Sequence, residues 1–184
     1  MKVGNVLLKL ASNAIENEFD ENIKIDDSIK KEFDILNEHR ATFVTLNLNG
    51  KLRGCIGSLI AHRSLFEDII HNAKAAAFSD LRFDRLSLQE FKSIEIEISI
   101  LTPFKELVYK DLDDLKQKLI PLKHGVILEL DGKRATFLPQ VWEQLPTFDA
   151  FLSQLCKKAG LDPSNLSGYP QIKTYEVEKI KKSS

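Results

Sequence analysis

The hexapeptide Leu52-Arg53-Gly54-Cys55-Ile56-Gly57 is the most informative stretch of this chain for its fold. It places two glycines, one arginine and one thiol inside a segment that otherwise has the composition of a β-strand. Glycine weakens a strand interior, because it has no side chain to pack and loses the most chain entropy on folding. Two glycines around Cys55 therefore predict a close approach to the backbone, by a ligand, by another strand or by a second part of the protein. The simplest alternative is a β-bulge beside a core cysteine.

A hairpin is predicted immediately before and through the hexapeptide. Residues 41–48 are rich in β-branched and aromatic side chains, and Asn49-Gly50 follows them. Asn-Gly is typical of a two-residue hairpin turn, because both central residues need a positive φ. The predicted pairs are Leu48 with Lys51, Leu46 with Arg53 and Val44 with Cys55.

This register also predicts which side chains share a face of the second strand. Because successive side chains alternate, Arg53 and Cys55 are expected on one face. Leu52, Gly54 and Ile56 are expected on the other. A bulge at either glycine would shift this register by one residue and change the faces.

The order of the elements predicts an α+β protein. Helix, hairpin, helix and strand occur in that order twice, which favours antiparallel sheets with flanking helices. The loops near Pro103 and Pro170 are the candidate boundaries of an inserted subdomain. Ser64 and Glu67 have the spacing of a capping box, which predicts a helix start at Ser64. The predicted elements are helices over 3–15, 64–77, 111–119 and 148–159, hairpins around 49–50 and 131–132, and strands over 94–100 and 174–180.

Composition sets limits on the class of function. The chain has 184 residues, 43% of them hydrophobic, which is enough for a substantial core. Its net charge of −1 gives no basic field to attract nucleic acid, so nucleic-acid binding is not expected. No apolar run is long enough to span a bilayer, and residues 1–5 do not resemble a signal peptide. A reduced, cytoplasmic protein is the expectation.

Neither a metal nor a cofactor is expected. The two cysteines and four histidines are scattered, without the spacing of metal ligands or of a disulfide framework. Gly54 and Gly57 follow a hairpin rather than a strand that leads directly into a helix, so they do not form a phosphate-binding or dinucleotide-binding loop.

Four blocks of sequence carry a family resemblance: Leu52 to Gly57, Ala75 to Phe83, Glu97 to Pro103, and His124 to Trp142. Taken together, they resemble the AMMECR1 family. The departures are Asp84-Arg85, where the family often has prolines, and Tyr169, near which the family commonly has a tryptophan.

The resemblance implies a two-part fold with an antiparallel sheet and flanking helices in each part. The larger part would comprise 1–104 and 170–184, and the smaller part 105–169. The hexapeptide would look into a cleft between them. The family has no established biochemical activity, but its microbial members often occur in a set with a Memo-like protein and a radical SAM protein.

One hypothesis for the function is a binding module that accepts a bulky ligand or a protein segment. Arg53 would anchor the partner, an exposed Trp142 would be a second anchor, and the glycines would permit strand addition. The alternative for Trp142 is core packing, and the alternative for Arg82 is bracing of its loop. The candidate binding residues are Leu52, Arg53, Gly54, Cys55, Ile56, Gly57, Arg82, His124 and Trp142.

The other hypothesis is an enzyme. Cys55 would be a nucleophile or a redox thiol, Arg53 would hold an anionic group of the substrate, and His124 would be the general base. A lone cysteine with a distant histidine does not by itself identify a catalytic pair. The sequence therefore leaves the choice between enzyme and binding module open.

Overall fold

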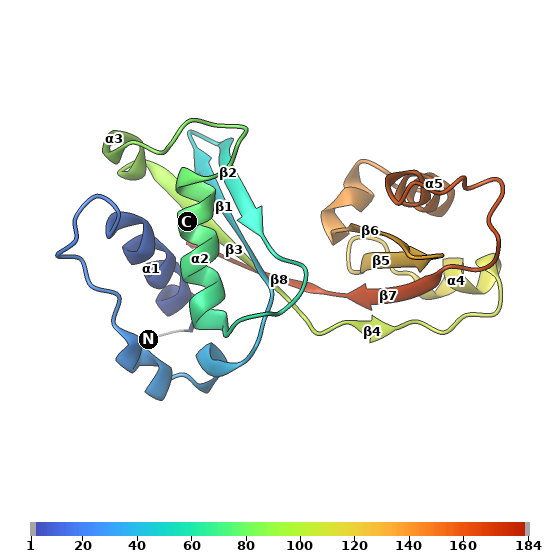
Figure 1. Ribbon diagram of the computed structural model, residues 1–184, viewed down its shortest axis with the longest axis horizontal. Coiled ribbons are helices and arrows are strands. Elements are labelled where there is room, and N and C mark those ends of the chain that lie inside the picture. Colours follow the sequence, from blue (N-terminus) through green and yellow to red (C-terminus); the bar gives the residue numbers. More distant parts are fainter. Residues whose placement is uncertain (1–2, 183–184) are drawn as a thin grey trace. The chain divides into compact units, whose positions relative to one another are not determined.

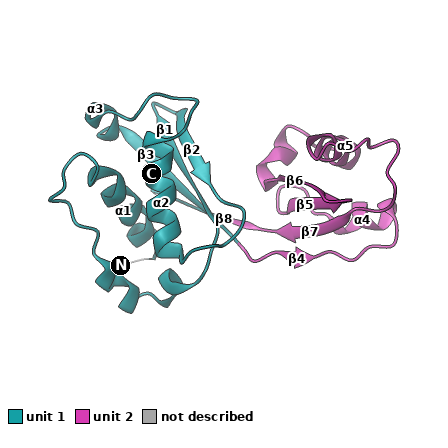
Figure 2. Ribbon diagram, in the orientation of Figure 1, with its two compact units in different colours: residues 1–101, 178–184 teal, residues 102–177 magenta. Residues whose placement is uncertain are grey.

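The computed structural model describes residues 3–182, so the outermost residues of the predicted larger part, 1–2 and 183–184, lie outside the described residues. The chain divides into two compact units. Unit 1 comprises Met1–Leu101 and Glu178–Ser184, and unit 2 comprises Thr102–Val177. Figure 2 shows the two units in different colours.

Unit 1 is built around a four-stranded sheet with the order β2-β1-β3-β8. Both long helices, α1 and α2, contribute buried side chains to its core, and Figure 1 shows them on the same side of the sheet. The elements are α1 (Val3–Glu16), η1 (Asp27–Lys31), η2 (Asp34–Asn37), β1 (Thr42–Leu48), β2 (Lys51–Gly57), α2 (Leu65–Phe78), α3 (Leu88–Phe91), β3 (Ile94–Leu101) and β8 (Val177–Lys181).

The two long helices form where their apolar periodicity predicts. The stripe of α1 is buried from Val6 to Ile15. Ser64 and Glu67 make the predicted capping box at the start of α2, which satisfies free N–H groups of the first turn. On α2, Ala73, Ala76 and other small buried residues allow the helix axis to come close to the sheet.

The β1–β2 hairpin has the predicted turn but a different register beyond it. Leu48 pairs with Lys51, as predicted. A β-bulge at Arg53 then shifts the ladder by one residue, so the predicted pairs Leu46 with Arg53 and Val44 with Cys55 are wrong. The observed pairs after the bulge are Leu46 with Gly54, Thr45 with Cys55 and Val44 with Ile56.

The bulge also corrects the predicted faces of β2. Residues that lie opposite each other on paired strands share a face of the sheet. Leu52 lies opposite Asn47, and Cys55 lies opposite Thr45, so Leu52 and Cys55 share one face. The prediction had placed Leu52 on the other face. Because the opposite face is the one that packs against α1 and α2, we call the face with Leu52 and Cys55 the open face of the sheet.

Unit 2 contains a second four-stranded sheet, with the order β4-β7-β5-β6, and its own core. The second predicted hairpin is confirmed, with Glu129 opposite Arg134. The elements are β4 (Lys105–Glu106), α4 (Leu112–Lys118), β5 (Gly125–Leu130), β6 (Lys133–Phe137), η3 (Pro139–Glu143), α5 (Phe148–Lys158) and β7 (Gln171–Tyr175).

The C-terminal strand differs from the prediction. The single strand expected over 174–180 is two strands, β7 and β8, which belong to different sheets. Because β7 pairs with β5, unit 2 extends to Val177 rather than to the boundary expected near Pro170. With five α-helices and two sheets in residues 3–182, and with antiparallel pairing in both sheets, the chain has the predicted α+β fold.

Candidate functional site

The hexapeptide lies on β2, which is an edge strand of the sheet of unit 1. Arg82 lies in the same unit, in the turn that follows α2, and it contacts the hexapeptide directly. His124 and Trp142 belong to unit 2. The site within unit 1 is therefore built from β2 and from the loop between α2 and α3.

The close approach predicted at the two glycines is made by the protein itself. A Cβ atom on Gly54 would overlap the backbone carbonyl of Ala76, so α2 lies directly on the strand at that point. A Cβ atom on Gly57 would overlap the ring of Phe43, which lies across the strand. Both glycines thus have a packing reason within unit 1.

Arg53 is the bulged residue, and its guanidinium is held by Glu90 on α3 and by the loop between α2 and α3. Nε donates to Oε1 of Glu90 at 2.8 Å, and Nη2 donates to Oε2 at 3.2 Å. Nη2 also donates to the backbone oxygen of Asp84 at 3.0 Å. Only 13% of the side chain is exposed, so most of its hydrogen-bonding capacity is used within unit 1.

Glu90 accepts hydrogen bonds both from Arg53 and from Ser87 at the start of α3. It forms a capping box with Ser87, whose backbone N–H and hydroxyl both donate to Oε2. The hydrogen bonds from Arg53, followed by those from Ser87, lower the pKa of Glu90 to about 2. The carboxylate therefore stays ionised well into the acidic range.

The Arg53–Glu90 pair predicts a specific response to acid. Because the pKa of Glu90 is lower in the folded state, the pair stabilises the fold fully above the ordinary pKa of 4.5, and this stability is lost as the pH falls toward 2. We expect Glu90→Gln to make the free energy of unfolding less dependent on pH between 4.5 and 2. Arg53→Gln should have the same effect, since it removes the main cause of the shift. Urea titrations at several pH values measure this slope, and an unchanged slope in both variants would contradict the assignment.

Asp80 and Arg82 form a second ion pair, which we call the Asp80–Arg82 clamp because both side chains bind the backbone of Cys55. Oδ2 of Asp80 accepts the N–H of Cys55 at 2.9 Å, and Nη2 of Arg82 donates to the backbone oxygen of Cys55 at 3.2 Å. Nη2 and Nε of Arg82 donate to Asp80 at 2.7 and 3.0 Å. These bonds from Arg82 are the main cause of the pKa of Asp80 lying well below its usual range. The structure thus supports bracing as a role of Arg82.

Leu81, the residue between Asp80 and Arg82, is exposed. Asp80 to Phe83 form a tight turn, in which the N–H of Phe83 donates to the oxygen of Asp80 and the N–H of Arg82 donates to the Asp80 carboxylate. We call residues 80–83 the Leu81 turn. Leu81 is 101% exposed, the highest value among the exposed large hydrophobic side chains of the described chain.

Among the described residues, the only hydrogen bond to the sulfur of Cys55 comes from a hydroxyl group. The hydroxyl of Thr45 donates to Sγ at 3.3 Å, and the thiol is half-buried on the open face. Within residues 3–182, no histidine, carboxylate or lysine forms a hydrogen bond with this sulfur. Cys156 is fully buried in the core of unit 2, where burial raises the pKa of its thiol. It is the core residue that its place in an apolar helical stripe indicates.

Trp142 is not the exposed anchor that the binding hypothesis requires. Its side chain is buried in unit 2, where it stacks on Phe151 with ring centroids 3.7 Å apart. Its Nε1 donates to the backbone oxygen of His124 at 3.0 Å. Burial lowers the pKa of His124, and its Nδ1 accepts the N–H of Ile120. Trp142 is therefore a core residue of unit 2, in line with the core-packing alternative.

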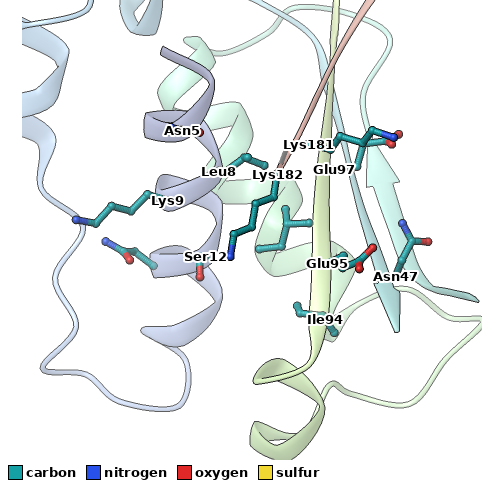
Figure 3. Close-up of a pocket in the computed structure, with 12 residues that line it drawn as sticks. Asn5, Leu8, Lys9, Ser12, Asn47, Ile94, Glu95, Glu97, Lys181 and Lys182 are labelled. Atoms are coloured by element: carbon teal, nitrogen blue, oxygen red, sulfur yellow. The ribbon is translucent and has the colours of Figure 1, made fainter. Parts of the chain in front are cut away.

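A separate groove of about 1010 Å³ lies elsewhere in unit 1 and does not include the hexapeptide. It runs between α1 and the start of β3, and Figure 3 shows Lys182 reaching into the space between them. Its walls carry charges of both signs, including Lys182 and Glu95, and Leu8 and Ile96 add apolar surface. This mixture does not specify one class of ligand.

Three features of unit 1 were not predicted from the sequence. They are the carboxylate of Glu90, the exposure of Leu81 and a buried network around Asp68. The pattern Ser87-x-x-Glu90 is a signal for a capping box and could have located Glu90 at a helix start. No comparable local signal connects Asp68 with its partners.

Within residues 3–182, no group of three or more histidine, cysteine, aspartate or glutamate side chains is arranged to hold a metal ion. The same residues include no helix that combines the length and the apolar character needed to cross a bilayer.

Comparison with known proteins gives one consistent family. A family model described as AMMECR1 matches residues 8–180. A protein from Methanothermobacter thermautotrophicus is 34% identical over 182 residues, covering 95% of this chain and 91% of its own length. A protein from Methanopyrus kandleri is 34% identical over 171 residues, covering 89% of this chain and 80% of its own. The crystal structure of an uncharacterized protein from Pyrococcus horikoshii superposes with a TM-score of 0.76 and 31% identity, over 96% of this chain and 89% of that one.

Proposed function

This chain belongs to the AMMECR1 family, and we propose that its unit 1 works as a protein-binding module. The proposed binding surface consists of the Leu81 turn, residues 80–83, together with Leu52 on the open face of the sheet. The proposed partners are the Memo-like and radical SAM proteins that the family resemblance leads us to expect.

The observation that carries this proposal is the way the fold presents Leu81. Its neighbours Asp80 and Arg82 are both fixed to the backbone of β2, yet the leucine side chain between them is wholly exposed. A side chain carried by a fixed backbone leaves less chain to order on binding, so more of its burial energy becomes affinity. An exposed leucine on a fixed turn therefore suits insertion into an apolar pocket of a partner.

The neighbouring side chains have the composition of an interface. The side chain of Arg82 is 56% exposed, although it is paired with Asp80. The guanidinium carbons of Arg53 and Arg82 lie 5.7 and 5.5 Å from the ring centroid of Phe83. Leu52 is 44% exposed. Arginine and aromatic residues are enriched in protein interfaces, and they often supply the residues that dominate the binding energy.

The enzyme hypothesis has less support from the geometry. A thiolate nucleophile needs a base or another group that lowers its pKa. The sulfur of Cys55 receives a hydrogen bond from Thr45, and the acidic and basic groups nearby, Asp80 and Arg82, are paired with each other. The binding proposal uses the same residues without requiring an activated thiol.

The proposal predicts that Leu81→Ser weakens partner binding strongly. Burying a leucine side chain contributes about 1.5–3 kcal/mol, so its loss should raise the Kd about 10- to 100-fold. Purified Memo-like and radical SAM proteins from the same organism are titrated with the full chain by calorimetry. The matched control is Val108→Ser, because Val108 is 78% exposed but lies in unit 2.

Two outcomes of this titration would contradict the proposal. One is the absence of binding between the wild-type chain and either partner. The other is an equal loss of affinity in Leu81→Ser and Val108→Ser, which would place the interface elsewhere. A turnover detected with the partners that disappears in Cys55→Ser would favour the enzyme hypothesis instead.

A further inference from the structure

The backbone N–H and C=O groups of β2 point alternately toward β1 and away from it. The N–H of Ser58 donates to the oxygen of Thr42 at 3.0 Å, so Ser58 points toward β1. Successive residues of a strand point their backbone groups to opposite sides. Ile56 therefore also points toward β1, and Cys55 and Gly57 point their N–H and C=O groups away from it. Because β2 is the edge strand, these groups lie where a fifth strand would pair.

The Asp80–Arg82 clamp fills this place at Cys55. A residue of a neighbouring strand would supply one acceptor for the N–H and one donor for the C=O. Asp80 supplies the acceptor at 2.9 Å, and Arg82 supplies the donor at 3.2 Å. Because the two side chains also bind each other at 2.7 Å, they act as one unit.

The rest of the loop is tied to the same edge one step along the strand. Arg53 binds the carboxylate of Glu90 and the backbone oxygen of Asp84, so the chain between α2 and α3 is attached to β2 at the bulge as well. Bulges and covering loops are devices by which proteins protect edge strands from pairing with other chains.

We propose that the Asp80–Arg82 clamp takes the place of a fifth strand on β2 and keeps this edge from pairing with a second copy of the chain. Asp80 and Arg82 also flank Leu81 in the proposed binding surface, but this inference concerns the backbone edge of β2 and is tested without either partner protein. Among the described residues, the backbone groups of Gly57 have no side-chain or loop partner, so the edge is open at Gly57 and closed by the clamp at Cys55.

The register of such pairing can be read from Cys55. In a symmetric antiparallel pair centred on this residue, Cys55 of one copy lies opposite Cys55 of the other. Hydrogen-bonded antiparallel pairs have Cα atoms about 5.5 Å apart, which falls within the range that a disulfide bridges. A disulfide between the two Cys55 thiols therefore detects this pairing. Cys156 does not form such a disulfide, because it is fully buried.

The test is the double variant Asp80→Ala/Arg82→Ala in the full chain. We expect it to form a larger assembly than the wild type in analytical ultracentrifugation. With diamide as the oxidant, we also expect a disulfide-linked dimer that the wild type does not form. Adding Cys55→Ser should remove the covalent dimer and leave the larger assembly. The matched control is Asp114→Ala/Lys118→Ala, which removes an exposed ion pair of unit 2 and should behave as the wild type.

A folded double variant with the mass of the wild type and no covalent dimer would overturn the proposal. So would covalent dimer in the wild type, because its edge would then be open. If the alanine variant does not fold, Asp80→Leu/Arg82→Met keeps much of the bulk of both side chains, and neither new side chain can accept from the N–H of Cys55 or donate to its oxygen, so the same expectations apply. Amide exchange of the wild type is a further check: the N–H of Cys55 should exchange slowly and that of Gly57 quickly. Rapid exchange at Cys55 would also overturn the proposal.

Discussion

Gly54→Val should lower the free energy of unfolding by about 3 kcal/mol, because overpacking at rigid backbone is among the costliest core changes. The Cβ atom of any larger residue would overlap the carbonyl of Ala76 on α2. Neither Gly54 nor Ala76 can move without loss of hydrogen bonds, since β2 is paired with β1 and the carbonyl of Ala76 belongs to α2. The sheet and α2 would have to separate, with loss of the apolar contacts between them.

Chemical denaturation followed by far-ultraviolet circular dichroism measures this effect. The matched control is Gly168→Val, because a Cβ atom at Gly168 meets no atom within 4 Å. A substitution in such open space is expected to change stability by less than about 0.5 kcal/mol. Equal effects of the two valines would show that the contact between β2 and α2 is looser than the structure indicates.

Asp68→Ala should lower the free energy of unfolding by about 3 kcal/mol, the scale for removing one partner of a buried ion pair. The carboxylate is fully buried, and its partner Arg63 is one-third exposed. Removing the carboxylate leaves buried donors without an acceptor, which is costlier than losing the bonds alone. The buried donors left without this acceptor are the N–H and hydroxyl of Thr42. Nδ2 of Asn72 keeps the two oxygens of Thr42 as acceptors, and the partly buried hydroxyl of Ser58 and guanidinium of Arg63 also lose their bonds to the carboxylate.

Asp114→Ala is the matched control for this prediction. Asp114 also pairs with a basic side chain, Lys118, but both groups are more exposed. Pairs of this kind contribute at most about 1 kcal/mol. Urea unfolding of both variants at neutral pH compares them directly. A loss at Asp68 no greater than the loss at Asp114 would show that water reaches the network.

Local signals predicted the elements of the fold, and tertiary packing decided their details. Asn49-Gly50 predicted the hairpin turn, and Ser64 with Glu67 predicted the start of α2, because both signals act within a few residues. The bulge at Arg53 could not be located from such signals. The bulge lies beside Gly54, where α2 meets the strand, and that contact joins segments that are far apart in the sequence.

The same limit applies to the candidate site. The hexapeptide and Arg82 were identified from their residue types, and the structure brings them together. Glu90 was not identified, because it meets Arg53 across 37 positions of sequence. For Trp142 the sequence left both exposure and core packing open, and the structure shows core packing. One aromatic residue in a short helix does not reveal that Phe151 will cover it.

Unit 2 is, in topological terms, an insertion into unit 1. The chain leaves unit 1 after β3 and returns to it through β8, and these two strands are neighbours in the same sheet. At the start and end of unit 2, Thr102 and Glu176 exchange two hydrogen bonds of 2.9 Å. A short hairpin turn could therefore join β3 to β8 without altering the order of the remaining strands. The fold of unit 1 has the connectivity of a complete domain, into which a second domain has been spliced at a single point.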